Sequence, residues 1–337
     1  MRASKPFPSA ALLALLLYQS VLAQTLPSGG TVVKGSATIQ PNGANQVIIT
    51  QTSSKAIINW KDFSIGAGGT VSFDQPDSRS IILNRVVDGG PRSNIYGKLT
   101  ANGQVFIVNP NGVYFGAGSS VDVGGLLATT LNINDDDFLN GNYVFTRGSL
   151  DAARREVINE GVLKARGNGY VVLAGDYAAN RGIVQAKLGT VALASGSKMT
   201  LDVQGDSLIS FAVNEKTVAQ LSGVENSGQL LADGGRAIMT AAVATDLQTA
   251  VVNNTGLVRA NTAEERNGEI ILSADGGNTQ NSGTLDVSGK AAGQKGGSIK
   301  VLGNKVALTG NALLDASGDA GGGTINVGGN YQGKGPL

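Results

Sequence analysis

The feature that most constrains the fold is a phrase that recurs along the second half of the chain: asparagine, any residue, glycine, then a short aliphatic stretch. The phrase begins at Asn159, Asn180, Asn226, Asn254 and Asn281. Its copies are 21, 46, 28 and 27 residues apart, and we take the step of 46 as about two repeats. A repeat of this length is typical of solenoids, in which each coil buries its apolar face against its neighbours. The chain is therefore predicted to form a stack of coils.

Between the copies, aliphatic residues stand two apart, as they do along a strand with one buried face. The pairs include Leu285 and Val287, Ile299 and Val301, and Ile325 and Val327. Strands of four to seven residues separated by Gly, Asn, Asp or Ser predict an all-β, right-handed parallel β-helix. Only a short turn at residues 150–157 is expected to be helical.

A sandwich of antiparallel hairpins is the alternative all-β arrangement. Asn-Gly pairs favour two-residue hairpin turns, and several occur, among them those beginning at Asn42, Asn102, Asn140 and Asn267. The long recurrence of Asn-x-Gly argues against hairpins as the organising principle. We therefore expect a few hairpins outside the coils of a β-helix.

The composition excludes much catalytic chemistry. The chain has no cysteine and no histidine, which removes disulfides, thiolate nucleophiles, Cys-based zinc sites and Ser-His triads. Its net charge of +1 gives no electrostatic reason to expect nucleic acid as a partner. We predict no enzyme activity, no cofactor and no metal site. Three adjacent acids, Asp135–Asp137, are interpreted as a solvated turn, and Trp60 as a core residue.

The first 23 residues have the pattern of a secretory signal peptide. Arg2 and Lys5 are followed by an apolar run from Ala10 to Leu17, and cleavage is expected between Ala23 and Gln24. The apolar run is shorter than the ~20 residues of a membrane-spanning helix. The mature protein is therefore expected to be exported and soluble.

The two ends of the predicted stack differ. Residues 26–39 contain Pro27 and Gly29-Gly30 before the first strands, and they are predicted to cap the front edge. Residues 321–337 are still repeat-like and show no cap. At ~22 to 25 residues per coil, the mature chain predicts about 13 coils and the start of a longer solenoid.

One apolar run breaks the alternation of buried and exposed positions. Residues 105–108 read Val-Phe-Ile-Val, so both faces of this strand should be buried. We predict that Phe106 and Val108 are covered by residues 135–148, where Phe138, Tyr143 and Phe145 flank an Asn-Gly pair in a hairpin-like layout.

Three motifs then occur in a fixed order. They are Ala56–Gly66 (AIINWKDFSIG), Ile82–Val86 (ILNRV) and Asn109–Gly116 (NPNGVYFG). In this order they resemble the N-terminal, haemagglutination-activity domain of filamentous-haemagglutinin-like two-partner secretion exoproteins. The resemblance covers about residues 27–150. It implies a secretion domain at 24–150 and a β-helical repeat region at 151–337.

The resemblance also implies partners. Such exoproteins cross the inner membrane by the general secretory route, and an outer-membrane β-barrel transporter with POTRA domains then exports them to the cell surface or medium. The family's secretion motif falls on Asn109, Pro110, Asn111 and Gly112, with Asn84 in the second motif. Whether the turn is contacted by the transporter or only shapes the domain is left open. Residues 74–78 (DQPDS) stand where some members have an additional Asn-Pro-Asn-Leu motif, so contacts of that motif are not transferred.

Adhesion to a host-cell or glycan receptor is the role that the resemblance implies for the rod. A stalk that delivers a C-terminal toxin is the alternative. A polysaccharide-acting enzyme is less favoured, because the acids and bases are scattered among turns.

Overall fold

The computed structural model describes residues 26–87, 89–148, 155–202, 210–215, 222–243 and 250–328. The predicted signal peptide and its cleavage site at Ala23 and Gln24 lie outside these residues. Among the described residues, no helix is long and apolar enough to cross a membrane.

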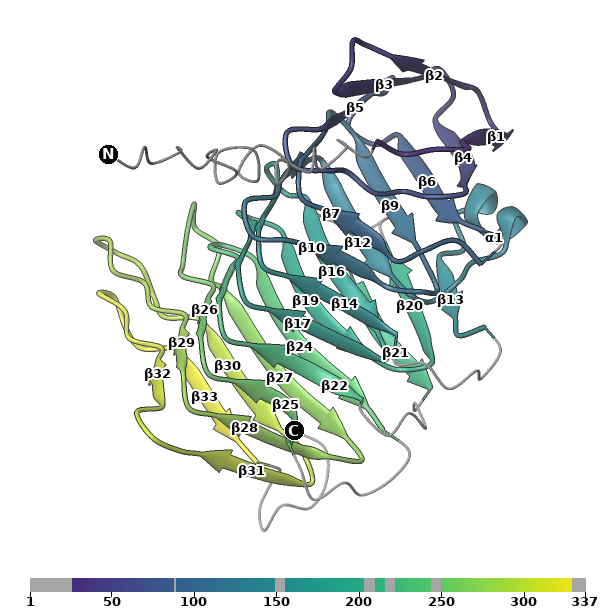
Figure 1. The fold of residues 1–337 in the computed structure, drawn as a ribbon. Coiled ribbons are helices and arrows are strands. Elements are labelled where there is room, and N and C mark those ends of the chain that lie inside the picture. The colour runs from purple at the N-terminus through teal and green to yellow at the C-terminus, as the bar shows by residue number, and fades with distance from the viewer. Residues whose placement is uncertain are drawn as a thin grey trace, which may run out of the picture.

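Three long sheets run along the molecule (Figure 1). The first sheet contains β1 (Thr31–Lys34), β4 (Lys55–Trp60), β6 (Ile81–Val86), β9 (Gln104–Val108), β12 (Gly125–Thr129), β16 (Tyr170–Gly175), β19 (Thr190–Ser195), β24 (Arg236–Ala242), β27 (Glu269–Asp275), β30 (Ser298–Leu302) and β33 (Thr324–Val327). The second contains β2 (Ala37–Pro41), β3 (Gln46–Gln51), β5 (Thr70–Asp74), β8 (Lys98–Ala101), β11 (Ser120–Val123), β15 (Val162–Ala165), β18 (Ile183–Ala186), β23 (Gln229–Leu231), β26 (Leu257–Arg259), β29 (Thr284–Asp286) and β32 (Leu313–Asp315). The third contains β7 (Ser93–Ile95), β10 (Val113–Phe115), β14 (Glu156–Asn159), β17 (Tyr177–Asn180), β22 (Gly223–Asn226), β25 (Ala250–Asn254), β28 (Asn278–Asn281) and β31 (Lys305–Leu308).

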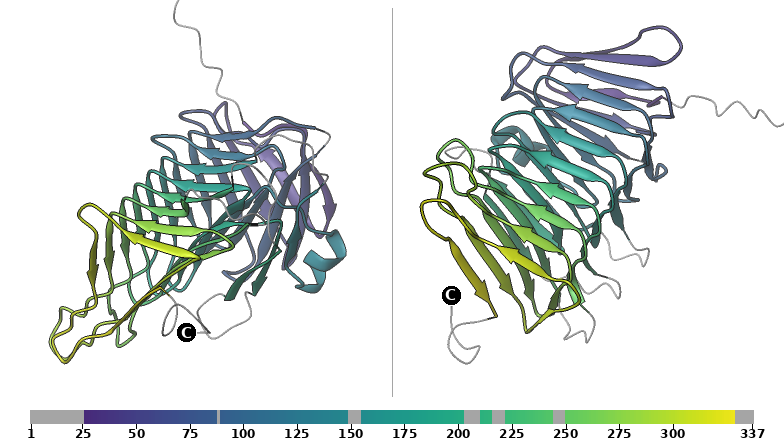
Figure 2. Two further views of the ribbon diagram at one scale, coloured as in Figure 1. Left: turned by 90° about the horizontal axis from the view of Figure 1, so that it is seen from below. Right: turned by 90° about the vertical axis from the view of Figure 1, so that its left-hand side faces the viewer.

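From β5 to β31, each coil visits the second, the first and then the third sheet, and successive coils pair in parallel. The two further views show the coils stacked into a rod (Figure 2). The prediction of a parallel β-helix is confirmed. In the described part of the chain, ten of the eleven strands of the first sheet run parallel, since β1 alone pairs antiparallel. Each coil contributes one of these parallel strands, so the described residues form fewer coils than the predicted 13. The difference arises because the chain leaves the coils between β12 and β14 and again between β19 and β22.

The second of these excursions corrects the repeat count. The step of 46 residues between Asn180 and Asn226 is a single coil, because β17 pairs directly with β22. The extra length forms β20 (Lys198–Asp202) and β21 (Ser210–Glu215), an antiparallel pair outside the coil. A hairpin outside the coils was predicted, although not at this place.

Two apolar cores follow from the two faces of the first sheet. The inner core fills the coil along its whole length, and Ile58, Val105 and Ile299 are among its fully buried members. A second core lies on the outer face of the front strands. It contains Phe106 and Val108, both fully buried, packed with aromatic residues of the first excursion.

The cover over this outer core is built from α1 (Asp135–Asn140), β13 (Val144–Thr146), β20 and β21. Phe106 lies 5.5 to 6.0 Å, between ring centroids, from Phe138, Tyr143 and Phe145. The prediction that residues 135–148 cover Phe106 and Val108 is therefore confirmed. The hairpin-like layout is wrong, because a helix takes its place and β13 pairs with β20 instead.

The short helix α1 explains the three adjacent acids, which form its first turn rather than a solvated loop. The Asn134 side chain accepts a hydrogen bond from the Asp136 N–H and caps the start. Gly141, with φ of 83°, ends the helix in the left-handed conformation that glycine adopts without strain. The Asn140-Gly141 pair is thus a helix end and not a hairpin turn.

The front edge of the stack is closed by antiparallel strands. β1 pairs antiparallel with β4, and β2 pairs antiparallel with β3 through a hairpin at Asn42-Gly43. Trp60 is 1% exposed beneath this cap, and a Cβ at Gly30 would lie 2.5 Å from its ring. The predicted cap is confirmed. The three sheets pass residue 150 without a break in pairing, and the domain division at 150/151 stays a prediction.

Candidate functional site

The Asn109–Gly112 motif is a tight turn at the corner between β9 and β10, where the chain passes from the first sheet to the third. The Gly112 N–H donates to the Asn109 carbonyl at 2.9 Å, which closes the turn. The Asn111 N–H donates to the Asn109 side-chain oxygen, also at 2.9 Å. Gly112 has φ of 103°, a conformation that strains any other residue.

Both asparagines of the turn are fastened to the preceding coil. Asn109 is fully buried, and its Nδ2 donates to the Pro91 carbonyl at 2.9 Å and to Ser93 Oγ at 3.0 Å. Asn111 is exposed, and its Nδ2 donates to the Gly90 carbonyl at 2.7 Å. Buried polar groups are costly unless they are paired, and those of Asn109 are paired within the chain. The turn is therefore a connector between two adjacent coils.

Asn84 does not join the turn at the surface. It lies on β6, fully buried and facing the interior of the coil. Its Oδ1 accepts a hydrogen bond from Trp60 Nε1 at 3.0 Å, and its Nδ2 donates to the Phe106 carbonyl at 3.4 Å. The motif residue therefore links three successive coils from the inside.

Gln75 occupies the place of the additional motif that this chain lacks. Its side chain is 4% exposed, and Nε2 lies 3.0 Å from Gln51 Oε1 and 3.1 Å from the Ser80 carbonyl. Its Oε1 accepts from the Gly103 N–H at 3.1 Å. One buried amide thus joins neighbouring coils at this corner.

Two cations that the sequence analysis did not single out hold the helix of the cover. Arg85 Nη1 lies 2.7 Å from Asp135 Oδ1, and Arg85 Nη2 donates to the Ile133 carbonyl at 2.8 Å. Lys55 Nζ donates to the Leu139 carbonyl at 2.8 Å, near the other end of the helix. Arg85 follows Asn84 in the second motif, so this motif serves both faces of the first sheet. The alternation of sides along a strand was the available signal.

A surface cluster lies over the Asn109–Gly116 stretch, and the sequence analysis missed it as well. The guanidinium carbon of Arg92 is 4.9 Å from the ring centroid of Tyr114, and the rings of Tyr96 and Tyr114 are 5.8 Å apart. The Tyr114 hydroxyl donates to Glu160 Oε2 at 2.6 Å. This hydrogen bond raises the pKa of Tyr114 and lowers the pKa of Glu160, because it favours the phenol and the carboxylate.

The asparagines of the recurring phrase form a ladder inside the coils. Each Nδ2 donates to the Oδ1 of the next asparagine at 2.7 to 2.8 Å, from Asn159 through Asn180, Asn226 and Asn254 to Asn281. All five are fully buried. The glycine two positions later is also required, since a Cβ at Gly228 would lie 2.1 Å from the Gly182 carbonyl oxygen. The repeat is therefore a structural device.

One buried ion pair joins the cover to the coil. Asp176 follows β16, its side chain is 1% exposed, and its Oδ2 lies 2.9 Å from Arg147 Nη2. Burial raises the pKa of Asp176, while the charges of Arg147 and Arg155 oppose that rise. One buried carboxylate is thus acted on by two arginines, and Arg147 ties it to the end of the cover.

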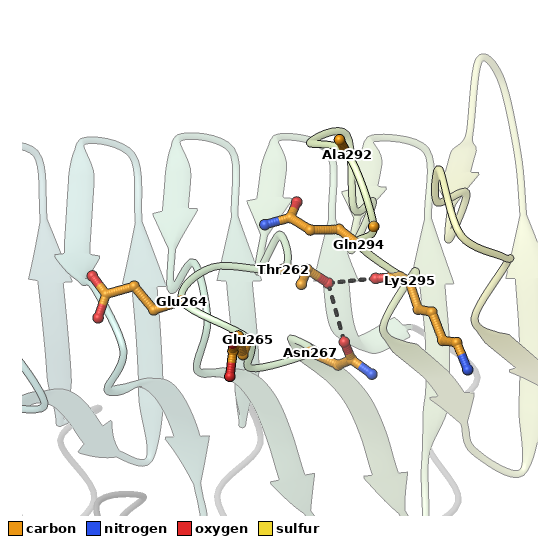
Figure 3. A pocket seen from close by; sticks show the side chains of 8 residues that line it. Thr262, Glu264, Glu265, Asn267, Ala292, Gln294 and Lys295 are labelled. Atoms are coloured by element: carbon orange, nitrogen blue, oxygen red, sulfur yellow. Dashed lines mark hydrogen bonds between the residues drawn. The ribbon is translucent and has the colours of Figure 1, made fainter.

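An open pocket of about 610 Å³ lies near the other end of the rod (Figure 3). Its walls are two loops, and Thr262 Oγ1 joins them by donating to the Lys295 carbonyl at 2.6 Å. The side chains of Glu264 and Lys295 point away from each other, and Glu264 pairs instead with Lys187 at 3.0 Å. The charged groups do not converge on the pocket. Among the described residues, no group of three or more Asp or Glu side chains is arranged to hold a metal ion.

Comparisons with known proteins agree with this architecture. A family model described as the TPS secretion domain matches residues 23–287. Two curated relatives, both named heme/hemopexin-binding protein and both from Haemophilus influenzae, are 33% identical over 90% of this chain and 36% identical over 80% of it. The chain belongs to the TPS, or two-partner secretion, family of secretion domains. The resemblance found in the three motifs is thereby confirmed.

Solved structures give the same result. The crystal structure of the HMW1 secretion domain from Haemophilus influenzae matches with a TM-score of 0.80 and 31% identity, over 91% of this chain and 78% of that chain. The filamentous hemagglutinin secretion domain matches with a TM-score of 0.54 and 15% identity, over 89% of this chain and all of that one, and shares the fold. This is a family of secretion domains and not of enzymes. The chain spans about a third of the length of the curated relatives, 34% and 29%.

Proposed function

We propose that the chain is the N-terminal module of an exported exoprotein, delivered to the periplasm by the general secretory route. An outer-membrane β-barrel transporter with POTRA domains then recognises the module and passes the chain to the cell surface or medium. The observation that carries this proposal is the match to the TPS secretion domain over residues 23–287, on a chain that stacks as a parallel β-helix. Nucleic acid has no part in this function.

The secretion motif serves this function through the fold. Asn84 and Asn109 are fully buried, and their side chains make hydrogen bonds to neighbouring coils. Their removal leaves buried partners unpaired, which costs about 1–3 kcal/mol at each site. Pro110 and Gly112 set the path of the turn, and Asn111 fastens its exposed side to Gly90.

For the rod behind the module we propose extended display outside the cell without catalysis. Adhesion to a host-cell or glycan receptor is the favoured role. The names of the curated relatives support a second candidate, binding of heme or hemopexin by the whole exoprotein. A toxin-delivery stalk and a polysaccharide-acting enzyme are weaker candidates, since no observation favours either.

Secretion assays test the proposal. The chain is produced in cells that either contain or lack its partner transporter, and the protein in the medium is measured. We expect release only with the transporter, and lower release for Asn109→Ala. Equal release from cells without any such barrel transporter would overturn the proposed function.

A further inference from the structure

The surface cluster formed by Arg92, Tyr96 and Tyr114 has the chemistry of a protein-binding site. Arg92 and Tyr96 are exposed at the two ends of β7, and Tyr114 lies beside them on β10, half-buried. β7 and β10 are neighbours in the front part of the third sheet (Figure 1). Tyrosine and arginine supply a large share of the binding energy at protein interfaces. Aromatic residues make up only 5% of this chain, so a cluster of two exposed or half-exposed tyrosines is unusual for it.

The motif glycines form the floor of this cluster. A Cβ at Gly112 would lie 3.3 Å from Cγ and Cδ of Arg92, and a Cβ at Gly116 would lie 2.3 Å from the Tyr96 ring. Both side chains pack against the backbone of these glycines. A larger residue in place of either glycine would displace the side chain above it. The Asn109–Gly116 stretch, whose asparagines are engaged within the chain, thus displays Arg92 and Tyr96 above it.

Hydrogen bonds hold the cluster in one arrangement. Arg92 Nε donates to Asn94 Oδ1 at 3.1 Å, and Glu160, which accepts from Tyr114, also accepts from Arg181 Nη1 at 3.0 Å. Pre-organised side chains lose little conformational entropy when a partner binds. The cluster is therefore better suited to recognition than a set of mobile surface residues.

The charges around the cluster indicate the chemistry of the partner. Arg92 stacks on the Tyr114 ring and, among the described residues, forms no ion pair with a carboxylate. Arg181 already pairs with Glu160, whereas Lys98 is exposed at the start of β8. The guanidinium of Arg92, which no carboxylate of the described residues pairs with, is complementary to a carboxylate of an acidic partner.

We propose that the cluster of Arg92, Tyr96 and Tyr114 is the surface that an acidic segment of the transporter's periplasmic domains contacts. This inference rests on the proposed function and names a contact surface beside the motif. The tyrosine rings cover apolar parts of the segment, and Arg92 and Lys98 face its carboxylates.

The test measures binding of the folded, purified chain to the purified periplasmic domains of its partner transporter. Tyr96→Ala and Arg92→Glu are each expected to weaken binding by about tenfold or more, as loss of a hot-spot residue does. Both changes lie at the surface, so the melting temperature should stay close to that of the unmodified chain. Lys164→Glu is the matched control, because Lys164 is exposed on β15 in the second sheet and should bind as the unmodified chain does.

A double-mutant cycle tests whether Gly116 affects binding through the position of the Tyr96 ring or through a general change in the fold. Gly116→Ala should displace the Tyr96 ring and weaken binding, yet it should have no further effect in the Tyr96→Ala background. Full affinity of Tyr96→Ala and Arg92→Glu would overturn the inference and leave the proposed function standing. So would transporter-dependent secretion of a chain whose folded form does not bind. Secretion that needs no transporter would overturn both.

Discussion

The front and back of the rod differ on the outer face of the first sheet, although the same ladder of strands runs through both. One row of outward-facing residues, joined in register, reads Ile57, Leu83, Phe106, Leu127, Val172, Ala192, Ile238, Ile271, Lys300 and Asn326. The members from Ile57 to Ala192 are fully buried beneath the cover, whereas Lys300 and Asn326 are partly exposed. The burial of these side chains therefore decreases where the cover ends.

The corner of the third sheet changes in the same direction. Ile95 and Phe115 occupy it in the front coils, and they stand in register with the asparagine ladder that begins at Asn159. Ile95 and Phe115 are fully buried, as are the asparagines. In the front coils this corner is held by apolar packing that differs from coil to coil. In the back coils the same asparagine hydrogen bond is repeated from coil to coil. A repeated hydrogen bond allows further coils to be added one by one, whereas the front coils depend on motifs that occur once in the chain.

The largest test of this comparison removes an outward side chain from each part. Phe106→Ala should lower the free energy of unfolding by about 3–5 kcal/mol, because it empties a buried aromatic cluster. Ile271→Ala, in the same row but half-buried, should cost less than about 1.5 kcal/mol. Urea denaturation measures both. Equal costs would mean that the cover does not distinguish the two parts.

The asparagine ladder should show a position effect. Asn226→Ala removes the acceptor of Asn180 and the donor to Asn254, so two buried neighbours lose a partner, at about 1–3 kcal/mol each. Asn281→Ala removes one hydrogen bond of the ladder, the one that Asn254 donates, and should cost about half as much. The comparison by thermal or urea unfolding fails if the two variants are equally stable.

How much of this could be predicted depended on which interactions repeat. Period-two aliphatics and the Asn-x-Gly phrase predicted the parallel coils, and the double-sided apolar run at residues 105–108 predicted the cover. The helix α1 was missed because six residues carry too little periodicity, and its ends depend on Lys55 and Arg85, which are distant in sequence. The coil between Asn180 and Asn226 was miscounted because an inserted hairpin leaves no mark on the repeat itself.

The candidate site was predicted only in part. The motif positions could be transferred from the resemblance, but the burial of Asn84 and Asn109 could not, since it depends on Trp60, Pro91 and Ser93 in other coils. Arg92 and Tyr96 lie outside the motif, and only the stacking of β7 on β10 brings them over Gly112 and Gly116.

A smaller effect should follow from loosening the cover without emptying its core. Arg85→Ala removes the ion pair to Asp135 and the hydrogen bond to the Ile133 carbonyl, for a loss of about 1–2 kcal/mol. Hydrogen exchange should accelerate at the amides of α1 and β13 and stay unchanged in β27 and β30. Lys300→Ala is the matched control on the bare part of the sheet. Uniform acceleration along the rod would contradict an independent cover.

The smallest effect concerns alkaline pH and again belongs to the front. Burial raises the pKa of Tyr143 to about 12 from its ordinary value of 10.0, because the phenolate would lose hydration. The folded chain holds this proton more tightly than the unfolded chain, so the associated stability is complete below pH 10 and is lost as the pH rises toward 12.

Tyr143→Phe should flatten the fall of the urea midpoint between pH 10 and 12. The residual slope should come from Tyr170, whose pKa is raised by burial, and from Tyr114, whose pKa is raised by its hydrogen bond to Glu160. Tyr143 and Tyr170 both belong to the outer core of the front coils. Amides of β27 and β30 should keep their exchange protection in that range, because none of the chain's tyrosines lies between residues 178 and 330. If these back strands lose protection as early as α1 does, the cover and the rod unfold as one unit, and the division drawn between them is wrong.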